Sequence, residues 1–176
     1  MNTSLVMTII GVDRPGLVGR LSAVVADHNG NWLESRMAHL GGQFAGILRV
    51  QVPADQEQNL LAALDALETQ GLSVRTQKDP SSQTAPTLRA LASVEVVGHD
   101  RPGIVREISQ VFAKHHVNVE ELVTRCESAP MSGELLFHAN ATVQLSQSYT
   151  IGQLRQALEE IAADLMVDIA VMPDHV

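Results

Sequence analysis

The sequence is poor in aromatic residues, in cysteine and in positive charge, and each shortage limits the structures or functions that the protein can have. Aromatic residues make up 3% of the 176 residues, so a hydrophobic core must be built from aliphatic side chains. The single cysteine, Cys126, excludes disulfides within the chain and is typical of a reducing compartment. The 12 basic residues stand against 20 acidic ones, which gives a formal net charge of −8. An acidic surface repels phosphate backbones, so DNA binding through an extended face is disfavoured.

Long hydrophobic runs are also absent. No stretch approaches the roughly 20 apolar residues that a membrane-spanning helix needs. The amino terminus does not resemble a signal peptide, because no Lys or Arg precedes the apolar run at 5–10 and Asp13 follows soon after it. We therefore expect a cytoplasmic protein.

One segment of the sequence occurs twice. Gly11-Val12-Asp13-Arg14-Pro15-Gly16-Leu17-Val18 is repeated at 98–105, at an offset of 87 residues that continues without a gap. Of the 24 positions in 11–34, twelve are identical to those in 98–121. The repeat is too long for a solenoid. We therefore expect two copies of one small domain at 1–78 and 88–176, joined by a polar linker with two prolines at 79–87.

The first copy begins with a predicted strand and a predicted helix. The apolar run Leu5–Val12 contains Val and Ile and favours a buried strand. An apolar stripe at helical spacing starts at Leu17, and Asn29-Gly30 ends it with a glycine suited to the left-handed conformation. Pro15 fits the first turn of this helix, where its missing N–H has no cost.

The remainder of the copy predicts a hairpin, a second helix and a last strand. Residues 31–52 favour a hairpin around Gly41-Gly42. Asp55 and Gln58 form a capping-box pattern at the start of the second helix, and the last strand covers 72–77. This order of elements is that of the ferredoxin-like α+β fold, in which two helices cover one face of an antiparallel sheet.

The second copy repeats this order with one difference. Residues 128–133 replace the short glycine turn, so the hairpin carries an insertion. Thr150 with Gln153 again predicts a capping box. The predicted strands cover 88–97, 135–145 and 166–172, together with a strand that begins at 118.

The repeated Asp-Arg-Pro-Gly segment lies between a strand and a helix and is the main candidate for a binding site. The first N–H groups of a helix have no internal partner, and the helix dipole adds positive charge there, which suits a carboxylate or phosphate. Gly16 and Gly103 allow a ligand to approach the backbone closely, and Asp13 and Asp100 can accept hydrogen bonds from an ammonium group. These two preferences together point to an amino acid. The alternative is a purely structural N-cap Asp followed by a helix-starting Pro.

Two asparagines and three histidines complete the candidates. Asn31 and Asn118 stand at the start of the second strand of each copy. Their amides can donate to a carboxylate and accept from an ammonium, although Asn is also common in turns. His99 has no counterpart in the first copy and would add a ligand contact to one loop alone. His28 and His115 lie at the ends of the apolar helical stripes. Histidines at such positions more often pack in the core or interact with the helix end than bind a ligand.

Motifs for catalysis, metals and cofactors are missing from the sequence. It has no nucleophile elbow, no His-Glu-x-x-His, no P-loop and no cysteine cluster. His115 and His116 are adjacent and point to different helix faces, which makes them a poor metal pair. We therefore expect neither an enzyme nor a bound metal or cofactor.

The chain resembles the ACT domain, a family of small-molecule regulatory modules, in its order of strand, Asp-Arg-Pro-Gly loop, helix, asparagine and hairpin. The resemblance covers nearly the whole chain. The resemblance implies two ferredoxin-like modules packed side by side through their sheets, with a small amino acid such as glycine or serine at their interface. The 13–17 loop of one copy would then face Asn118, and the 100–104 loop would face Asn31. The implied ligand-binding residues are Asp13, Arg14, Pro15, Gly16, Leu17, Asn31, His99, Asp100, Arg101, Pro102, Gly103, Ile104 and Asn118.

A tandem ACT chain without a catalytic domain resembles the glycine cleavage system transcriptional repressor family. The resemblance implies a repressor that senses glycine and binds a DNA-binding activator protein instead of DNA. One alternative is a stand-alone regulatory subunit of an amino-acid-metabolising enzyme. A poorer alternative is a small hydrolase or lyase with Asp13 or Asp100 as the base. A homodimer is compatible with these functions.

Overall fold

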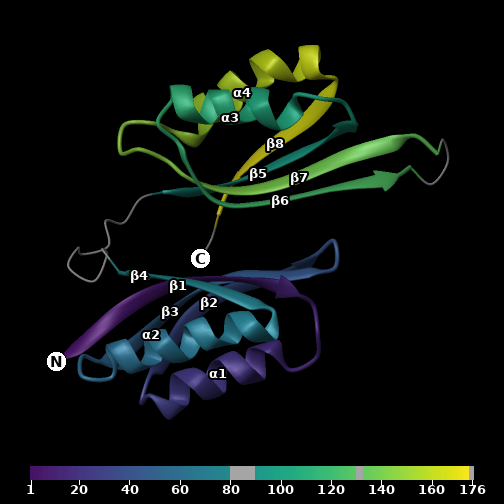
Figure 1. Ribbon diagram of the computed structural model, residues 1–176. Coiled ribbons are helices and arrows are strands. Elements are labelled where there is room, and N and C mark those ends of the chain that lie inside the picture. The colour runs from purple at the N-terminus through teal and green to yellow at the C-terminus, as the bar shows by residue number, and fades with distance from the viewer. Residues whose placement is uncertain (80–89, 130–132, 175–176) are drawn as a thin grey trace. The chain divides into compact units, whose positions relative to one another are not determined.

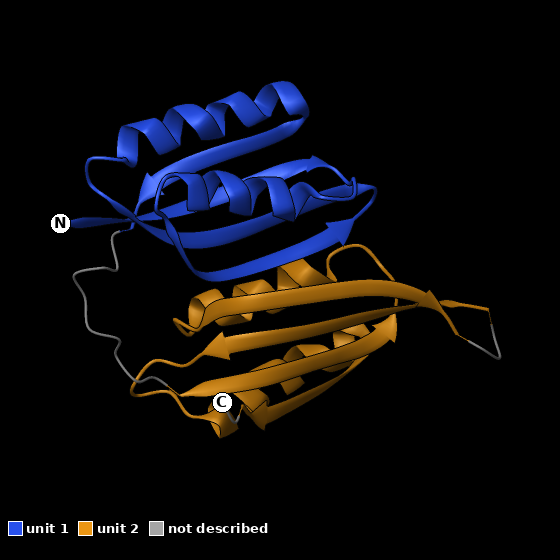
Figure 2. Ribbon diagram, turned by 90° about the horizontal axis from the view of Figure 1, so that it is seen from below, with its two compact units in different colours: residues 1–86 blue, residues 87–176 orange. Residues whose placement is uncertain are grey.

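The computed structural model describes residues 1–79, 90–129 and 133–174. The chain divides into two compact units, residues 1–86 and 87–176, which are coloured separately in Figure 2. Apart from Asp79, the predicted linker at 79–87 lies outside the described residues, and so do positions 130–132 of the predicted insertion.

Unit 1 is a four-stranded antiparallel sheet with two helices on one face (Figure 1). Its elements are β1 Asn2–Val12, α1 Leu17–Asp27, β2 Asn31–Leu40, β3 Gln43–Pro53, α2 Glu57–Ala66, a 3₁₀ turn Leu67–Gln70 and β4 Leu72–Lys78. The strand order is β2-β3-β1-β4. Gly41 and Gly42 have φ angles of 58° and 77°, as a tight hairpin turn requires.

Unit 2 has the same architecture. Its elements are β5 Leu91–His99, α3 Ile104–Lys114, β6 Asn118–Ser128, β7 Leu135–Gln144, α4 Ile151–Leu165 and β8 Val167–Pro173. Its strand order, β6-β7-β5-β8, is that of unit 1, and every neighbouring pair is antiparallel. The predicted tandem ferredoxin-like α+β fold is therefore confirmed for each unit.

Each unit has its own aliphatic core between the sheet and the helices. In unit 1 alternate residues of β1, among them Leu5 and Met7, pack beneath Leu21 of α1 and Leu60 of α2, and all four are almost fully buried. Burying one such side chain contributes about 1.5–3 kcal/mol. The helices turn their apolar stripes to these cores, and within the described part of the chain none is long and apolar enough to cross a membrane.

The ends of α1 and α3 differ from the prediction. Asn29, with φ of 55°, takes the left-handed conformation that was assigned to Gly30, and His116 takes it in unit 2 with φ of 53°. Gly30 is needed for another reason, because a Cβ there would lie 2.8 Å from the carbonyl oxygen of Val25. His28 lies at this helix end, and its Nδ1 is 2.8 Å from the oxygen of Val24. His115 instead stacks on Tyr149.

The two predicted capping boxes have different outcomes. At α4 the box forms, because Thr150 Oγ1 accepts from the Gln153 N–H and the Gln153 side chain accepts from the Thr150 N–H. At α2 the prediction was wrong. The N-cap there is Gln56, and no side chain caps the helix.

Gly11 and Gly98, which open the two repeated segments, permit close packing between the first and last strands of each unit. A Cβ on Gly98 would lie 2.6 Å from the carbonyl oxygen of Met166. A Cβ on Gly11 would overlap the carbonyl oxygen of Gly71. These glycines therefore fix the points at which the chain leaves the sheet of each unit and enters the Asp-Arg-Pro-Gly loop.

Candidate functional site

Each Asp-Arg-Pro-Gly loop is fastened to the hairpin of its own unit. The N–H of Asp13 donates to the carbonyl oxygen of Gly42 at 3.0 Å, and the N–H of Asp100 donates to that of Leu135 at 2.9 Å. The first residues of α1 and α3 are thereby held at the end of the sheet that carries the hairpin turn. The two loops occupy equivalent positions in their units.

The helices that follow the loops start without a side-chain cap. The N-cap residues are Gly16 and Gly103, with φ of 88° and 103°, and no side chain accepts from the first N–H groups. A Cβ at either glycine would meet no atom within 4 Å, so the space beside the backbone is open. The alternative of an N-cap Asp followed by a Pro in the helix is wrong, because α1 begins two residues after Pro15. The uncapped N–H groups are suited to a carboxylate.

Leu17 and Ile104, two of the predicted ligand-binding residues, point into the cores. Their side chains are 5% and 2% exposed. Any part that they take in binding must therefore come from their backbone N–H groups.

The aspartates of the two loops have different neighbours at equivalent positions. Asp13 Oδ2 lies 3.8 Å from Nε2 of His39 on β2. The position 87 residues after His39 is Cys126 on β6, an exposed residue whose pKa the Asp100 carboxylate influences. Partial desolvation, together with the charge and hydrogen bond of Asp100, raises the pKa of the Cys126 thiol. Sequence reasoning missed both partners, although the constant offset would have aligned them.

His99 makes the second loop different from the first, as its sequence position suggested. Its Nδ1 lies 3.6 Å from Oε2 of Glu134, and both side chains are more than half exposed. Val12 holds the equivalent place in unit 1 and is itself exposed.

The two loop arginines lie in different surroundings. Arg14 is exposed, whereas Arg101 is partly buried. The Nε atom of Arg101 is buried and has no hydrogen-bond partner among the described residues. Arg101, Pro102 and Gly103 line a cavity of about 220 Å³ between the start of α3 and the end of α4.

Asn31 and Asn118 lie at the opposite end of the sheet from the loop of their own unit. Asn31 is the first residue of β2 and pairs with Gln51, whereas the loop follows Val12, which pairs with Gln43 at the other end of β3. Eight residue steps along a strand span about 27 Å. Asn118 has the same place in β6, and its amide donates to Glu120 at 2.6 Å. A site that contains both an asparagine and a loop must therefore draw them from two modules.

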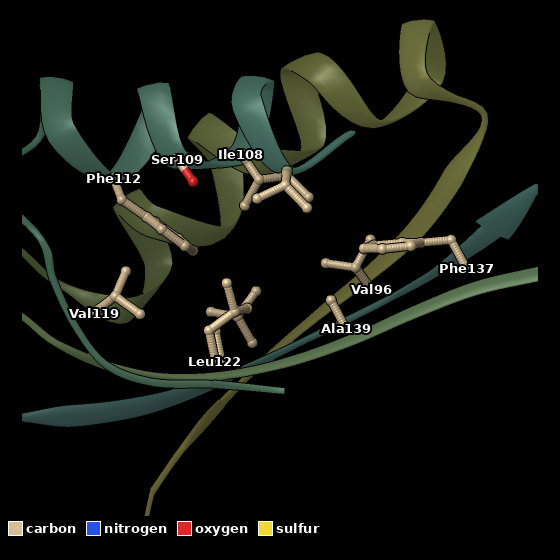
Figure 3. Close-up of a pocket in the computed structure, with 11 residues that line it drawn as sticks. Val96, Ile108, Ser109, Phe112, Val119, Leu122, Phe137 and Ala139 are labelled. Atoms are coloured by element: carbon tan, nitrogen blue, oxygen red, sulfur yellow. The ribbon is translucent and has the colours of Figure 1, made fainter. Parts of the chain in front are cut away.

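A second cavity in unit 2 is apolar. It lies between α3 and the sheet, where Ile108 and Phe112 face Val119 and Leu122, and Ser109 supplies its only hydroxyl group (Figure 3). In unit 1 the position of Val119 is taken by Trp32, which packs against the core. No ionised side chain lines this cavity, so it is unsuited to the charged ends of an amino acid.

Two family models match the chain, one in each unit. Residues 3–77 match an ACT domain, and residues 92–147 match a second ACT-domain model. The chain belongs to the ACT-domain family. The Asp-Arg-Pro-Gly loop of each ACT unit lies inside the matched range.

The tandem ACT chain is similar to known proteins over most of its length. It is 26% identical over 161 residues to the glycine cleavage system transcriptional repressor of Escherichia coli (strain K12). The match covers 92% of this chain and 85% of that protein. The crystal structure of a protein of unknown function from Galdieria sulphuraria has a TM-score of 0.82 at 28% identity, and the match covers 99% and 100% of the two chains. The structure of a candidate glycine cleavage system transcriptional repressor has a TM-score of 0.73 at 20% identity over 99% of each chain, and so shares the fold.

The contact between Asp100 and Cys126 predicts an effect on thiol reactivity. Asp100→Asn removes a negative charge that disfavours the thiolate, so the pKa of Cys126 falls and more thiolate is present at pH 8. We expect alkylation by iodoacetamide, followed by mass spectrometry, to become severalfold faster. Asp168→Asn is the matched control, because β8 is the far edge of the same sheet. Equal rates in the parent and Asp100→Asn chains would contradict the placement of the loop beside β6.

Proposed function

We propose that this protein is an amino-acid-sensing regulator that represses glycine cleavage genes in the cytoplasm by binding a DNA-binding activator protein. The observation that carries the proposal is the pair of uncapped helix starts, at Gly16 and Gly103, inside two ACT domains. The similarity to the glycine cleavage system transcriptional repressor extends over 92% of the chain and supports the same kind of function. That relative is named a repressor, which supports a protein that is not an enzyme.

The effector is a small amino acid such as glycine or serine. Its carboxylate binds the first N–H groups of α1 or α3, where partial positive charge gathers. Its ammonium group binds the exposed carboxylate of Asp13 or Asp100. Asn31 and Asn118 complete a site from a second module, since each lies at the wrong end of the sheet to reach its own loop.

The regulatory step is a shift between arrangements of modules. An amino acid that bridges two modules stabilises the arrangement to which it binds more tightly. A coupling of about 1–3 kcal/mol is enough for a useful switch. The formal net charge of −8 favours a protein partner over direct contact with a phosphate backbone.

Calorimetric titration with glycine, serine and the other small amino acids tests the ligand. We expect at least one to bind, and Asp100→Ala to weaken it about 10–100-fold, because a hydrogen bond to a charged group contributes about 1.5–3 kcal/mol. Asn31→Ala removes a neutral amide and should cost about 3–10-fold, from about 0.5–1.5 kcal/mol. Asp168→Ala on β8 has the same charge change and should leave the affinity unchanged. Absence of binding by every amino acid in the panel would remove the proposal.

A pull-down from a cell extract tests the partner. The full chain is immobilised, and the bound proteins are compared with and without the amino acid found by calorimetry. We expect a helix-turn-helix activator to be retained in an effector-dependent manner. Retention of an amino-acid-metabolising enzyme in its place would support the stand-alone regulatory subunit and contradict the repressor.

A further inference from the structure

One position beside the loop carries a different residue in each unit. His39 on β2 and Cys126 on β6 are separated by 87 residues, which is the offset of the repeat. His39 pairs with Phe44 and Cys126 pairs with Phe137, and both phenylalanines pack against the core of their unit. Because directly paired residues share a face of the sheet, His39 and Cys126 lie on the side that the helices cover.

In unit 1 this position supplies a base to the loop. Nε2 of His39 lies 3.8 Å from Oδ2 of Asp13, and the two side chains are 59% and 47% exposed. Histidine changes its charge between about pH 5 and 8. A protonated His39 offsets the negative charge of Asp13, whereas a neutral His39 leaves that charge to attract another cation.

The other neighbours of His39 carry no charge that would alter this pairing. On the helix side of β2 and β3 the adjacent side chains are Met37 and Phe44, both apolar. Within residues 1–79, Asp13 is the only ion-pair partner of His39. Protonation of His39 therefore acts on the loop through Asp13.

The basic residues near the first loop leave Asp13 to His39. Arg14 belongs to the loop itself and Arg20 to α1. Among the described residues of unit 1, neither of them forms an ion pair with Asp13. The charge on Asp13 is therefore offset by a group that titrates near neutral pH, and not by a permanent cation.

In unit 2 the equivalent position supplies no cation. Desolvation and the charge of Asp100 raise the pKa of the Cys126 thiol, so this exposed side chain is largely uncharged at pH 8 and below. His99 lies on the opposite face of the sheet, and its Nδ1 is 3.6 Å from Oε2 of Glu134. A fall in pH therefore creates no competitor for Asp100 at this position.

We propose that His39 makes the first amino-acid site weaker as the pH falls, whereas the second site, with Cys126 in its place, keeps its affinity. The inference rests on the proposed function, in which Asp13 or Asp100 holds the ammonium group of the effector. At the first site that ammonium group and a protonated His39 compete for one carboxylate. His39 is thus a regulatory residue that acts through Asp13 and needs no contact with the effector.

Calorimetric titration of the full chain at pH 8 and at pH 5.5 tests each site separately, with glycine and L-serine as the probes. Asp100→Ala weakens the second site, so that chain reports the first. Its affinity should be about two- to fivefold lower at pH 5.5, the range expected for an exposed ion pair. Asp13→Ala reports the second site, whose affinity should differ less than 1.5-fold between the two pH values.

Exchange of the two residues makes the test reciprocal. His39→Cys in the Asp100→Ala chain should remove the pH dependence, and Cys126→His in the Asp13→Ala chain should introduce it. A purely structural role of His39 would instead lower the affinity equally at both pH values. His116→Asn removes an exposed histidine at the end of α3 and should leave both pH profiles unchanged.

Failure of this inference can be told apart from failure of the proposed function. If a probe binds but the first site has the same affinity at both pH values, or the second site weakens in parallel, the role of His39 is overturned and amino-acid sensing stands. If neither probe nor any other small amino acid binds at pH 8, the proposed function falls and this inference falls with it. Thermal unfolding of each variant at both pH values checks that it is folded.

Discussion

The unsatisfied N–H groups at the starts of α1 and α3 are the feature on which the rest of the structure depends. The same chain builds a complete capping box at α4, so it is able to cap a helix with a side chain. At the two loops it places glycine at the N-cap, with a positive φ and open space beside the backbone. Glycine in place of a capping side chain costs a few tenths of a kcal/mol per helix. In return, the positive end of each helix stays accessible to an anion.

The ferredoxin-like fold holds these helix starts and separates them from the asparagines. A hydrogen bond from each loop aspartate to the neighbouring hairpin fixes the loop, and Gly11 or Gly98 fixes the point where the first strand ends. The same topology places Asn31 and Asn118 about 27 Å along the sheet from the loop of their own unit. Strand register therefore keeps each asparagine away from the loop of its own unit.

Most of the fold could be predicted from the sequence, because the repeat, the apolar periodicities and the glycine turn are local signals. The sequence-based predictions were wrong where one local sequence pattern is compatible with two local structures. Pro15 was placed in the helix, but a left-handed Gly16 follows it and starts the helix two residues later. Asp55 and Thr150 have the same spacing to a glutamine, yet only Thr150 is the N-cap residue. The surroundings of Arg101 could not be predicted, since Asp164, which lines the same cavity, lies more than 60 residues further along the chain.

The central claim is that a bound amino acid places its carboxylate on the uncapped start of α1 or α3. A crystal structure of the full chain grown with the amino acid identified by calorimetry tests it most directly. The account predicts a carboxylate oxygen within about 3 Å of backbone N–H groups at Gly16–Leu17 or Gly103–Ile104. A ligand bound with its carboxylate away from both helix starts would contradict it.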